Sequence, residues 1–263
     1  ISNQAMHIDT DQQIVKEALK YFFNTVGKHL RPALIFFSTK AVNNNGSLND
    51  NIISLTVAIE LIHNASLIHD DIVDEENNRR GILSLNRKFG NKIAMLIGDI
   101  VYTKAFSLLI NNTDKNLLRI VTNCVEKMCY GEVNELIRSE EFNYKEYIRI
   151  IDQKTAYLMS TCCEIGAMAG GGNIHQVECL KSYGKHFGFA YQIIDDYKDG
   201  GLPLEFSREF IRKARQHVQR AKVQTKKIGD SIAINKMCDL ADFIIPDKIE
   251  IKPKSLNIIE EVV

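Results

Sequence analysis

Two apolar helical runs in this chain each end in three aspartates at the same spacing. The triads are Asp70, Asp71 and Asp74, and then Asp195, Asp196 and Asp199. At about 100° per residue, positions i, i+1 and i+4 project within roughly a quarter-turn of one helix face. Three carboxylates at that spacing repel one another unless a cation binds them. The fold must therefore hold two helix ends that each present a cluster of negative charge.

The residues around the first triad indicate which cation and which ligand it serves. Mg²⁺ prefers one or two carboxylates together with the oxygens of a substrate phosphate. Arg79 and Arg80 follow the first triad, and their planar guanidinium groups suit phosphate oxygens. An acidic helix end followed by arginines is also commonly a solvated salt-bridge cluster. Recurrence of the triad favours a site for magnesium and a diphosphate.

The rest of the chain is patterned as helix. Apolar residues recur at i, i+3 and i+4, and strand-like alternation is scarce, so we expect an all-α protein with one domain over residues 1–263. Helices are expected at about residues 11–23, 51–74, 92–109, 117–137, 144–169, 175–196, 208–227 and 232–245. The basic helix from Arg208 to Lys227 is most simply a solvated face.

Composition excludes some classes of partner and location. The 33 basic residues balance 33 acidic ones, so no global field attracts nucleic acid or an anionic membrane. The six cysteines lack metal-site spacing, which predicts free thiols in a reducing cytoplasm. The apolar stretch from Ile93 to Ile110 is interrupted by Asp99 and Lys104, so we expect no transmembrane segment.

Further cationic candidates lie before the first triad. Gly27, Lys28 and Arg31 precede a helix that Pro32 can start, although basic residues beside a helix start are commonly solvated. His63 could be a core histidine. It also lies two turns before Asp70 on nearly the same helix face.

Seven motifs, in this order, carry a resemblance to a known family: GKHLRP, HNASLIHDDIVD, RRG, GD, GE, KTA and QIIDDYKD. The chain resembles the trans-isoprenyl (polyprenyl) diphosphate synthases over nearly its whole length, and the long-chain octaprenyl type in particular. This resemblance implies an isoprenoid synthase fold, a single-domain bundle of roughly ten or more helices around a deep central cavity. It also implies a homodimer.

The resemblance assigns roles to individual residues. The Mg²⁺ ligands would be Asp70, Asp71, Asp74, Asp195 and Asp199. The catalytic group would be Asp70, Asp71, Asp74, Lys154 and Asp195. The allylic diphosphate would be held by Arg79, Lys154, Thr155 and Gln192. Isopentenyl diphosphate would be held by Gly27, Lys28, Arg31, His63 and Arg80.

The implied reaction is a condensation. An allylic prenyl diphosphate, such as farnesyl diphosphate, ionises with Mg²⁺ assistance to a carbocation and pyrophosphate. The double bond of isopentenyl diphosphate attacks the carbocation, and a proton is lost to the released pyrophosphate. Repeated condensation gives a long all-trans prenyl diphosphate, expected to supply quinone side chains. A short-chain farnesyl or geranylgeranyl synthase is the alternative within the class. A terpene cyclase would normally lack the second triad and the Gly27 to Arg31 site. A non-catalytic regulatory subunit is the alternative outside it.

Small residues before the first triad bear on product length. Ser66 lies about 6 Å along the helix from Asp70, with Ala65 beside it, and the growing tail would pass this level. In short-chain members bulky aromatics close the pocket here, so small residues resemble the long-chain members. Small residues can equally serve close helix packing. Met128 is a further candidate, for the channel floor.

Two departures from the family pattern stand out. Leu83 and Ser84 replace a proline and a threonine, with mild consequences expected. Gly200, Gly201, Leu202 and Pro203 follow Asp199 at once, where the family has a lysine-rich loop, and we expect that the loop segment is absent only from the printed chain.

Overall fold

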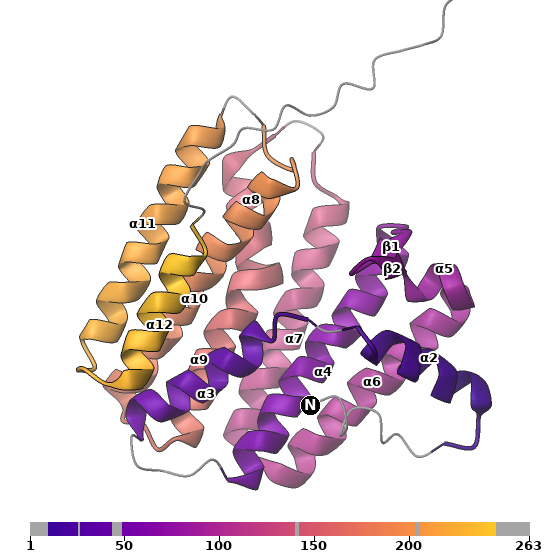
Figure 1. Cartoon of the computed structure of the whole chain (residues 1–263), viewed down its shortest axis with the longest axis horizontal. Coiled ribbons are helices and arrows are strands. Elements are labelled where there is room, and N and C mark those ends of the chain that lie inside the picture. The colour runs from indigo at the N-terminus through magenta and orange to yellow at the C-terminus, as the bar shows by residue number, and fades with distance from the viewer. Residues whose placement is uncertain (1–9, 26, 44–48, 140–141, 204–205, 246–263) are drawn as a thin grey trace, which may run out of the picture. The chain divides into compact units, whose positions relative to one another are not determined.

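Helices account for nearly all of the regular structure in the computed structural model of the chain, which describes residues 10–25, 27–43, 49–139, 142–203 and 206–245. The elements are α2 (Gln13–Phe23), α3 (Leu30–Val42), α4 (Asp50–Val73), β1 (Asn78–Arg79), β2 (Ile82–Leu83), α5 (Leu85–Phe89), α6 (Asn91–Asn112), α7 (Lys115–Leu136), α8 (Tyr144–Ile151), η1 (Asp152–Ala156), α9 (Tyr157–Ala169), α10 (Ile174–Lys198), α11 (Ser207–Lys226) and α12 (Ile232–Phe243) (Figure 1). The all-α prediction is confirmed.

Two features interrupt the predicted helices. Between α4 and α5 the chain forms a two-stranded antiparallel hairpin, in which Arg79 pairs with Ile82. The helix expected over 144–169 is continuous, but residues Asp152–Ala156 form a π-helix within it. π-helical turns inside α-helices are frequent at functional sites, and this one holds Lys154 and Thr155.

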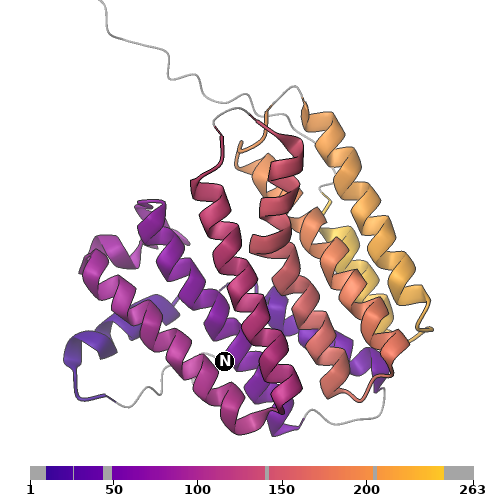
Figure 2. The same ribbon diagram turned by 180° about the vertical axis from the view of Figure 1, so that it is seen from behind.

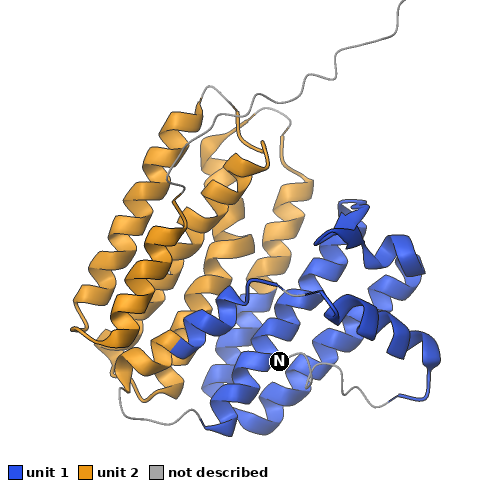
Figure 3. Ribbon diagram, viewed as in Figure 1, with its two compact units in different colours: residues 1–36, 45–125 blue, residues 37–44, 126–263 orange. Residues whose placement is uncertain are grey.

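The chain divides into two compact units, residues 1–36 with 45–125 and residues 37–44 with 126–263 (Figure 3). The prediction of one domain over 1–263 stays a prediction beside this division.

In unit 1, α4 packs along α6. Both helices bury apolar residues at helical spacing, as α6 does with Ala94, Ile97, Val101, Ala105 and Leu109. By length and composition alone, α4 and α6 are each long and apolar enough to cross a membrane, a test that core helices of soluble proteins also pass, so the expectation of no transmembrane segment stays a prediction. α4 is a core helix, with 67% of its most apolar window buried, against 33% for α6.

In unit 2, α10 lies between α9 and α11, side by side in both views (Figures 1 and 2). Its close approach to the neighbouring helix depends on glycine. A Cβ added at Gly188 would lie 2.5 Å from Cα of Ala156, and one at Gly184 would lie 2.4 Å from the carbonyl oxygen of Met159. Small residues therefore fix the register of the helix that delivers the second triad.

The six cysteines are free thiols, as expected. Burial raises the pKa of Cys163 to about 12, so this thiol stays protonated. Cys129 is exposed and Cys238 is half-buried, whereas the other four are buried.

Candidate active site

The end of α4 positions the first triad. Asn49 caps the start of the helix by accepting a 2.9 Å hydrogen bond from the backbone of Ile52. At the other end, the backbone N–H of Asp74 donates to the carbonyl of Asp70 at 2.8 Å. Asp70 is half-buried and Asp74 is exposed, but Asp71 is fully buried. The three carboxylates of the triad therefore differ in exposure, although their spacing places them near one helix face.

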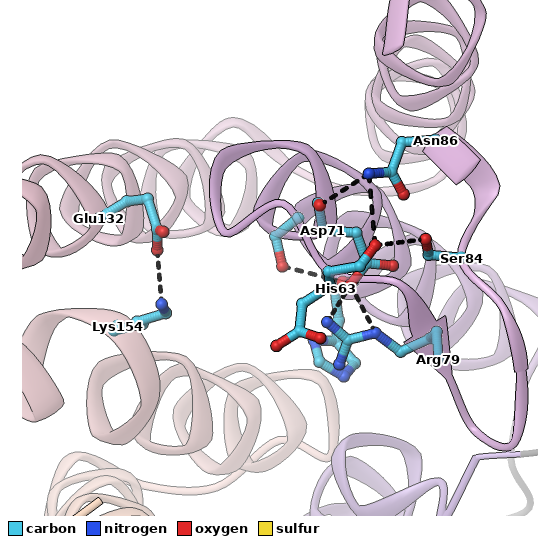
Figure 4. Close-up of polar contacts among 9 residues, drawn as sticks. His63, Asp71, Arg79, Ser84, Asn86, Glu132 and Lys154 are labelled. Atoms are coloured by element: carbon cyan, nitrogen blue, oxygen red, sulfur yellow. Dashed lines mark hydrogen bonds and ion pairs between the residues drawn. The ribbon is translucent and has the colours of Figure 1, made fainter. Parts of the chain in front are cut away.

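Asp71 faces inward because Arg79 binds it. Nε of Arg79 donates to Oδ1 of Asp71 at 2.8 Å, and Nη2 donates to the same oxygen (Figure 4). Burial lowers the pKa of Arg79, but the hydrogen bond and charge of Asp71 outweigh it and raise the pKa overall. Arg79 therefore stays charged, and Asp71 stays a predicted metal ligand only if this pair opens.

The backbone around this pair is fixed by the segment that follows the hairpin. Nδ2 of Asn86 donates to the carbonyl oxygen of Asp71 at 3.0 Å. Ser84, at the start of α5, donates its hydroxyl to the carbonyl of Glu76 at 2.6 Å (Figure 4). Ser84, one of the two departures noted in the sequence, thus closes the loop that carries Arg79 and Arg80.

A cationic cluster surrounds His63. Burial, and then the positive charges of Arg31, Arg80 and Arg79, hold the pKa of His63 well below its usual value. Gly27 lies against Arg80, since a Cβ at this position would come within 2.9 Å of the guanidinium Nη2. The structure thus brings together four of the five residues assigned to isopentenyl diphosphate; Lys28, the fifth, is exposed in the same loop as Gly27.

Left-handed backbone marks the same loops. Among the described residues, the non-glycine residues with positive φ are His29 (49°), Glu75 (51°) and Arg80 (52°). Such conformations cost free energy and cluster at functional sites. His29 is held by Glu60, whose Oε1 lies 3.1 Å from Nδ1 of the imidazole. Sequence reasoning missed this pair, although a carboxylate inside the apolar run of α4 was a signal for it.

In unit 2, Lys154 of η1 lies between two carboxylates of α7. Its Nζ is 2.8 Å from Oε2 of Glu132 (Figure 4) and 2.6 Å from Oε2 of Glu135. The two carboxylates of α7 therefore fix the position of the Lys154 ammonium group. A phosphate bound to Lys154 would share this group with Glu132 and Glu135. Glu135 was not predicted from the sequence.

A chain of hydrogen bonds links the remaining site residues of unit 2. The Thr155 hydroxyl donates to Oε1 of Gln192 at 2.7 Å, and Nε2 of Gln192 donates to Oδ1 of Asp196 at 2.7 Å. The Tyr147 hydroxyl donates to Oδ2 of Asp196 at 2.7 Å. Burial raises the pKa of Asp196, and its two hydrogen bonds lower it by less. Asp196 is thus held by protein groups, which agrees with its omission from the predicted metal ligands.

The connection after the second triad is short. The N–H of Asp199 donates to the carbonyl of Asp195 at 3.0 Å, and that of Gly201 to the carbonyl of Asp196 at 2.8 Å. Gly200 adopts a φ of 74°, which suits a helix end. The printed chain runs continuously from α10 to α11. The expectation of a segment missing from the printed chain stays a prediction.

The candidate chain-length residues differ in environment. Ala65 is fully buried, whereas Ser66 is half-buried and donates its hydroxyl to the carbonyl of His63 at 2.9 Å. One turn after Ala65, His69 contacts the carbonyl of Met95 on α6 at 3.2 Å, so this face of α4 packs on α6. Met128 is 8% exposed. The chain-length roles of Ala65, Ser66 and Met128 stay predictions.

The acidic residues fit magnesium held jointly with a ligand. Within the described ranges, no group of three or more His, Cys, Asp or Glu side chains is arranged to hold a metal alone. Mg²⁺ needs only one or two carboxylates when phosphate oxygens and water complete its shell. Asp70 with Asp74, and Asp195 with Asp199, each supply such a pair near a helix end.

The polyprenyl synthetase family model matches residues 12–201. The chain belongs to this family. It is 33% identical over 199 residues to the octaprenyl diphosphate synthase of Haemophilus influenzae, covering 75% of this chain and 60% of that protein. It is 35% identical over 198 residues to a short chain isoprenyl diphosphate synthase of Methanothermobacter thermautotrophicus, with 73% and 60% covered.

The fold is that of solved members. A polyprenyl synthase from Caulobacter crescentus, solved with calcium and isoprenyl diphosphate, superposes with a TM-score of 0.84 at 23% identity, covering 93% of each chain. By sequence, the chain spans about 60% of the length of the curated relatives named above.

Proposed function

We propose that this chain is a prenyl diphosphate synthase that condenses isopentenyl diphosphate with an allylic prenyl diphosphate. The observation that carries this proposal is the cluster of three arginines, Arg31 on α3 with Arg79 and Arg80 on the hairpin loop, around a neutral His63 on α4, the helix whose end carries Asp70 and Asp74. Such a cluster binds a polyanion, and the neighbouring carboxylates bind cations that accompany one.

The residues divide the work of the reaction. Arg31, His63 and Arg80 hold the diphosphate of isopentenyl diphosphate, and the Gly27 backbone leaves room for the Arg80 guanidinium. The resemblance assigns both Lys154 and Arg79 to the allylic diphosphate, and each cation would stabilise the charge that develops as it departs. Thr155 and Gln192 orient the same region through their hydrogen bond.

The acidic pairs take the metal. Asp70 with Asp74, and Asp195 with Asp199, would hold Mg²⁺, which neutralises the departing pyrophosphate when bound. The solved Caulobacter relative contains calcium and isoprenyl diphosphate together, which supports a divalent cation with a prenyl ligand here.

We propose a long-chain product, of use as a quinone side chain, because Ala65 and Ser66 are small. The relatives include both octaprenyl and short-chain synthases, so a farnesyl or geranylgeranyl product is the second candidate. A non-catalytic subunit is favoured only by the short connection after Asp199, since both triads are complete.

We further propose a cytoplasmic homodimer. In unit 1, α6 leaves Met95 and Leu96 about half exposed, at 49% and 53%. Leu96 lines a groove with Ile14, Ile93 and Ile100 between α2 and α6. An apolar groove of this kind suits burial against a second copy. Met95→Asp with Leu96→Asp should convert a dimer to monomer in light scattering.

The test of the proposed function is incorporation of labelled isopentenyl diphosphate by the purified chain alone, with farnesyl diphosphate and Mg²⁺. Incorporation into a lipid-soluble diphosphate supports the synthase, and product mass distinguishes long from short chains. No incorporation by correctly folded protein that still binds farnesyl diphosphate would favour the non-catalytic subunit.

A further inference from the structure

The solvent-facing side of α11 carries a concentration of positive charge, although the whole chain has no net charge. Exposed cations on α11 and directly after it are Arg208, Arg212, Arg215, Arg220, Lys226 and Lys227. Glu209 is the one acidic residue of the helix. The 33 basic and 33 acidic residues of the whole chain cancel, so this side of α11 is a local feature.

Four of these cations form a straight row. At about 100° and 1.5 Å per residue, Arg208, Arg212, Arg215 and Lys226 fall within about 60° of one another and extend about 27 Å along the helix. We call this row the basic stripe. Its straightness suits a flat surface better than a point-like ligand.

The basic stripe is not neutralised within the part of the chain that the structure describes. The ion pairs of α11 there use other lysines: Lys213 lies 3.5 Å from Glu209, and Lys222 lies 2.6 Å from Asp242. Lys213 also lies 4.0 Å from the centroid of the Tyr144 ring. Among the described residues, no carboxylate lies within ion-pair distance of the stripe cations.

Large exposed apolar side chains lie on α11 and on α12, the helix that packs against it. Val223 lies on the same side of α11 and is 52% exposed. Phe243, next to the Lys222 partner Asp242, is 86% exposed, and Ile232, at the start of α12, is 82% exposed. A purely solvated charged face would not need these residues, whereas a lipid interface accommodates both kinds.

We propose that the basic stripe docks this protein on the surface of an anionic lipid bilayer. Each Lys or Arg near such a surface contributes electrostatic attraction, and exposed aromatic and aliphatic side chains insert at the headgroup level. Nucleic acid would satisfy the cations but would leave Val223 and Phe243 in water. The basic stripe takes no part in the condensation reaction. Failure of the proposed activity would therefore not contradict membrane docking, and failure of docking would not contradict the activity.

The experiment measures partition of the full chain onto vesicles. One set contains equal parts phosphatidylglycerol and phosphatidylcholine, and the other contains phosphatidylcholine alone. Arg212→Gln with Arg215→Gln should lower the partition coefficient on the anionic vesicles by about 30-fold, because the usual electrostatic attraction of two arginines to the anionic surface is lost. Added salt should weaken wild-type binding. Phe243→Ser should weaken the binding that survives at high salt.

The matched control is Lys115→Gln with Arg119→Gln, which removes the same charge from exposed positions of α7. It should leave partition within about twofold of wild type, since these residues lie outside the stripe. Circular dichroism verifies that each variant folds.

Three outcomes would overturn the proposal. The first is equal binding of wild type and the Arg212/Arg215 variant, and the second is equal loss in the control variant. The third is no vesicle binding together with stripe-dependent binding to polyuridylate RNA, which would make the partner a nucleic acid.

Discussion

The phenolic hydroxyl of Tyr147 donates a 2.7 Å hydrogen bond to Oδ2 of Asp196, the central aspartate of the second triad. The Gln192 amide occupies the other carboxylate oxygen at 2.7 Å. This relationship joins α8 to α10 and holds both carboxylate oxygens of Asp196, while Asp195 is half-buried and Asp199 is exposed. Tyr147 is thus a positioning residue for the helix end.

Tyr147→Phe removes this donor while keeping the ring. A hydrogen bond to a charged group in a part-buried site is worth about 1.5–3 kcal/mol, and the free energy of unfolding should fall by that amount in urea titration. The control is Tyr130→Phe, because Tyr130 is exposed and bonds Glu126 at the surface; this change should cost less than about 0.5 kcal/mol. Equal losses in the two variants would contradict the positioning role.

Arg31→Ala should act on one substrate. Arg31 belongs to the cationic cluster around His63, so its loss should raise the KM for isopentenyl diphosphate by at least about tenfold while changing the KM for farnesyl diphosphate far less. Initial rates with each substrate varied in turn give both constants. Comparable increases in both would show that the two diphosphate sites are wrongly divided.

His217 makes stability depend on pH. Its Nδ1 lies 3.1 Å from Nδ1 of His186, and burial, then the charges of His186, Arg220 and Lys213, lower its pKa to about 4. In the unfolded chain the imidazole of His217 takes up a proton near pH 6.5, whereas in the native state it stays neutral down to about pH 4. Stability is therefore lost as pH falls from about 6.5 towards about 4.

The measurement compares wild type with His217→Asn, whose amide can still bond His186. Between pH 7 and pH 5, the urea midpoint of unfolding should fall more for wild type than for the variant. Midpoints that fall in parallel would exclude His217 as a source of the acid sensitivity.

Ser66 gives a sharper test of product length than Ala65. Ser66 is half-buried one turn before Asp70, so Ser66→Phe should shorten the products while leaving the first condensation largely intact. Ala65 is fully buried, so Ala65→Phe should also cost about 1–3 kcal/mol of stability through overpacking. Chromatography of the products decides: an unchanged length distribution in both variants would place the growing tail elsewhere.

Much of the fold was predictable because long amphipathic helices leave a strong periodic pattern. The pattern located α4 and α10 and the carboxylates at their ends to within a few residues. Spacing alone could not reveal that Asp71 turns inward, because that depends on Arg79, which the hairpin brings back to it. The contacts of Glu60 with His29 and of Tyr147 with Asp196 join residues far apart in the sequence, so periodicity could not identify either partner, although a carboxylate inside an apolar run indicated that Glu60 has one.

The most direct test of the account is the rate of condensation in wild type, Asp70→Ala and Asp195→Ala, each with Mg²⁺ and with EDTA. If the two helix ends act through metal on the departing diphosphate, EDTA abolishes turnover, Mg²⁺ restores it, and each substitution lowers the rate by at least about 10²-fold. Wild-type turnover that persists in EDTA, or near-normal rates in both variants, would contradict the account.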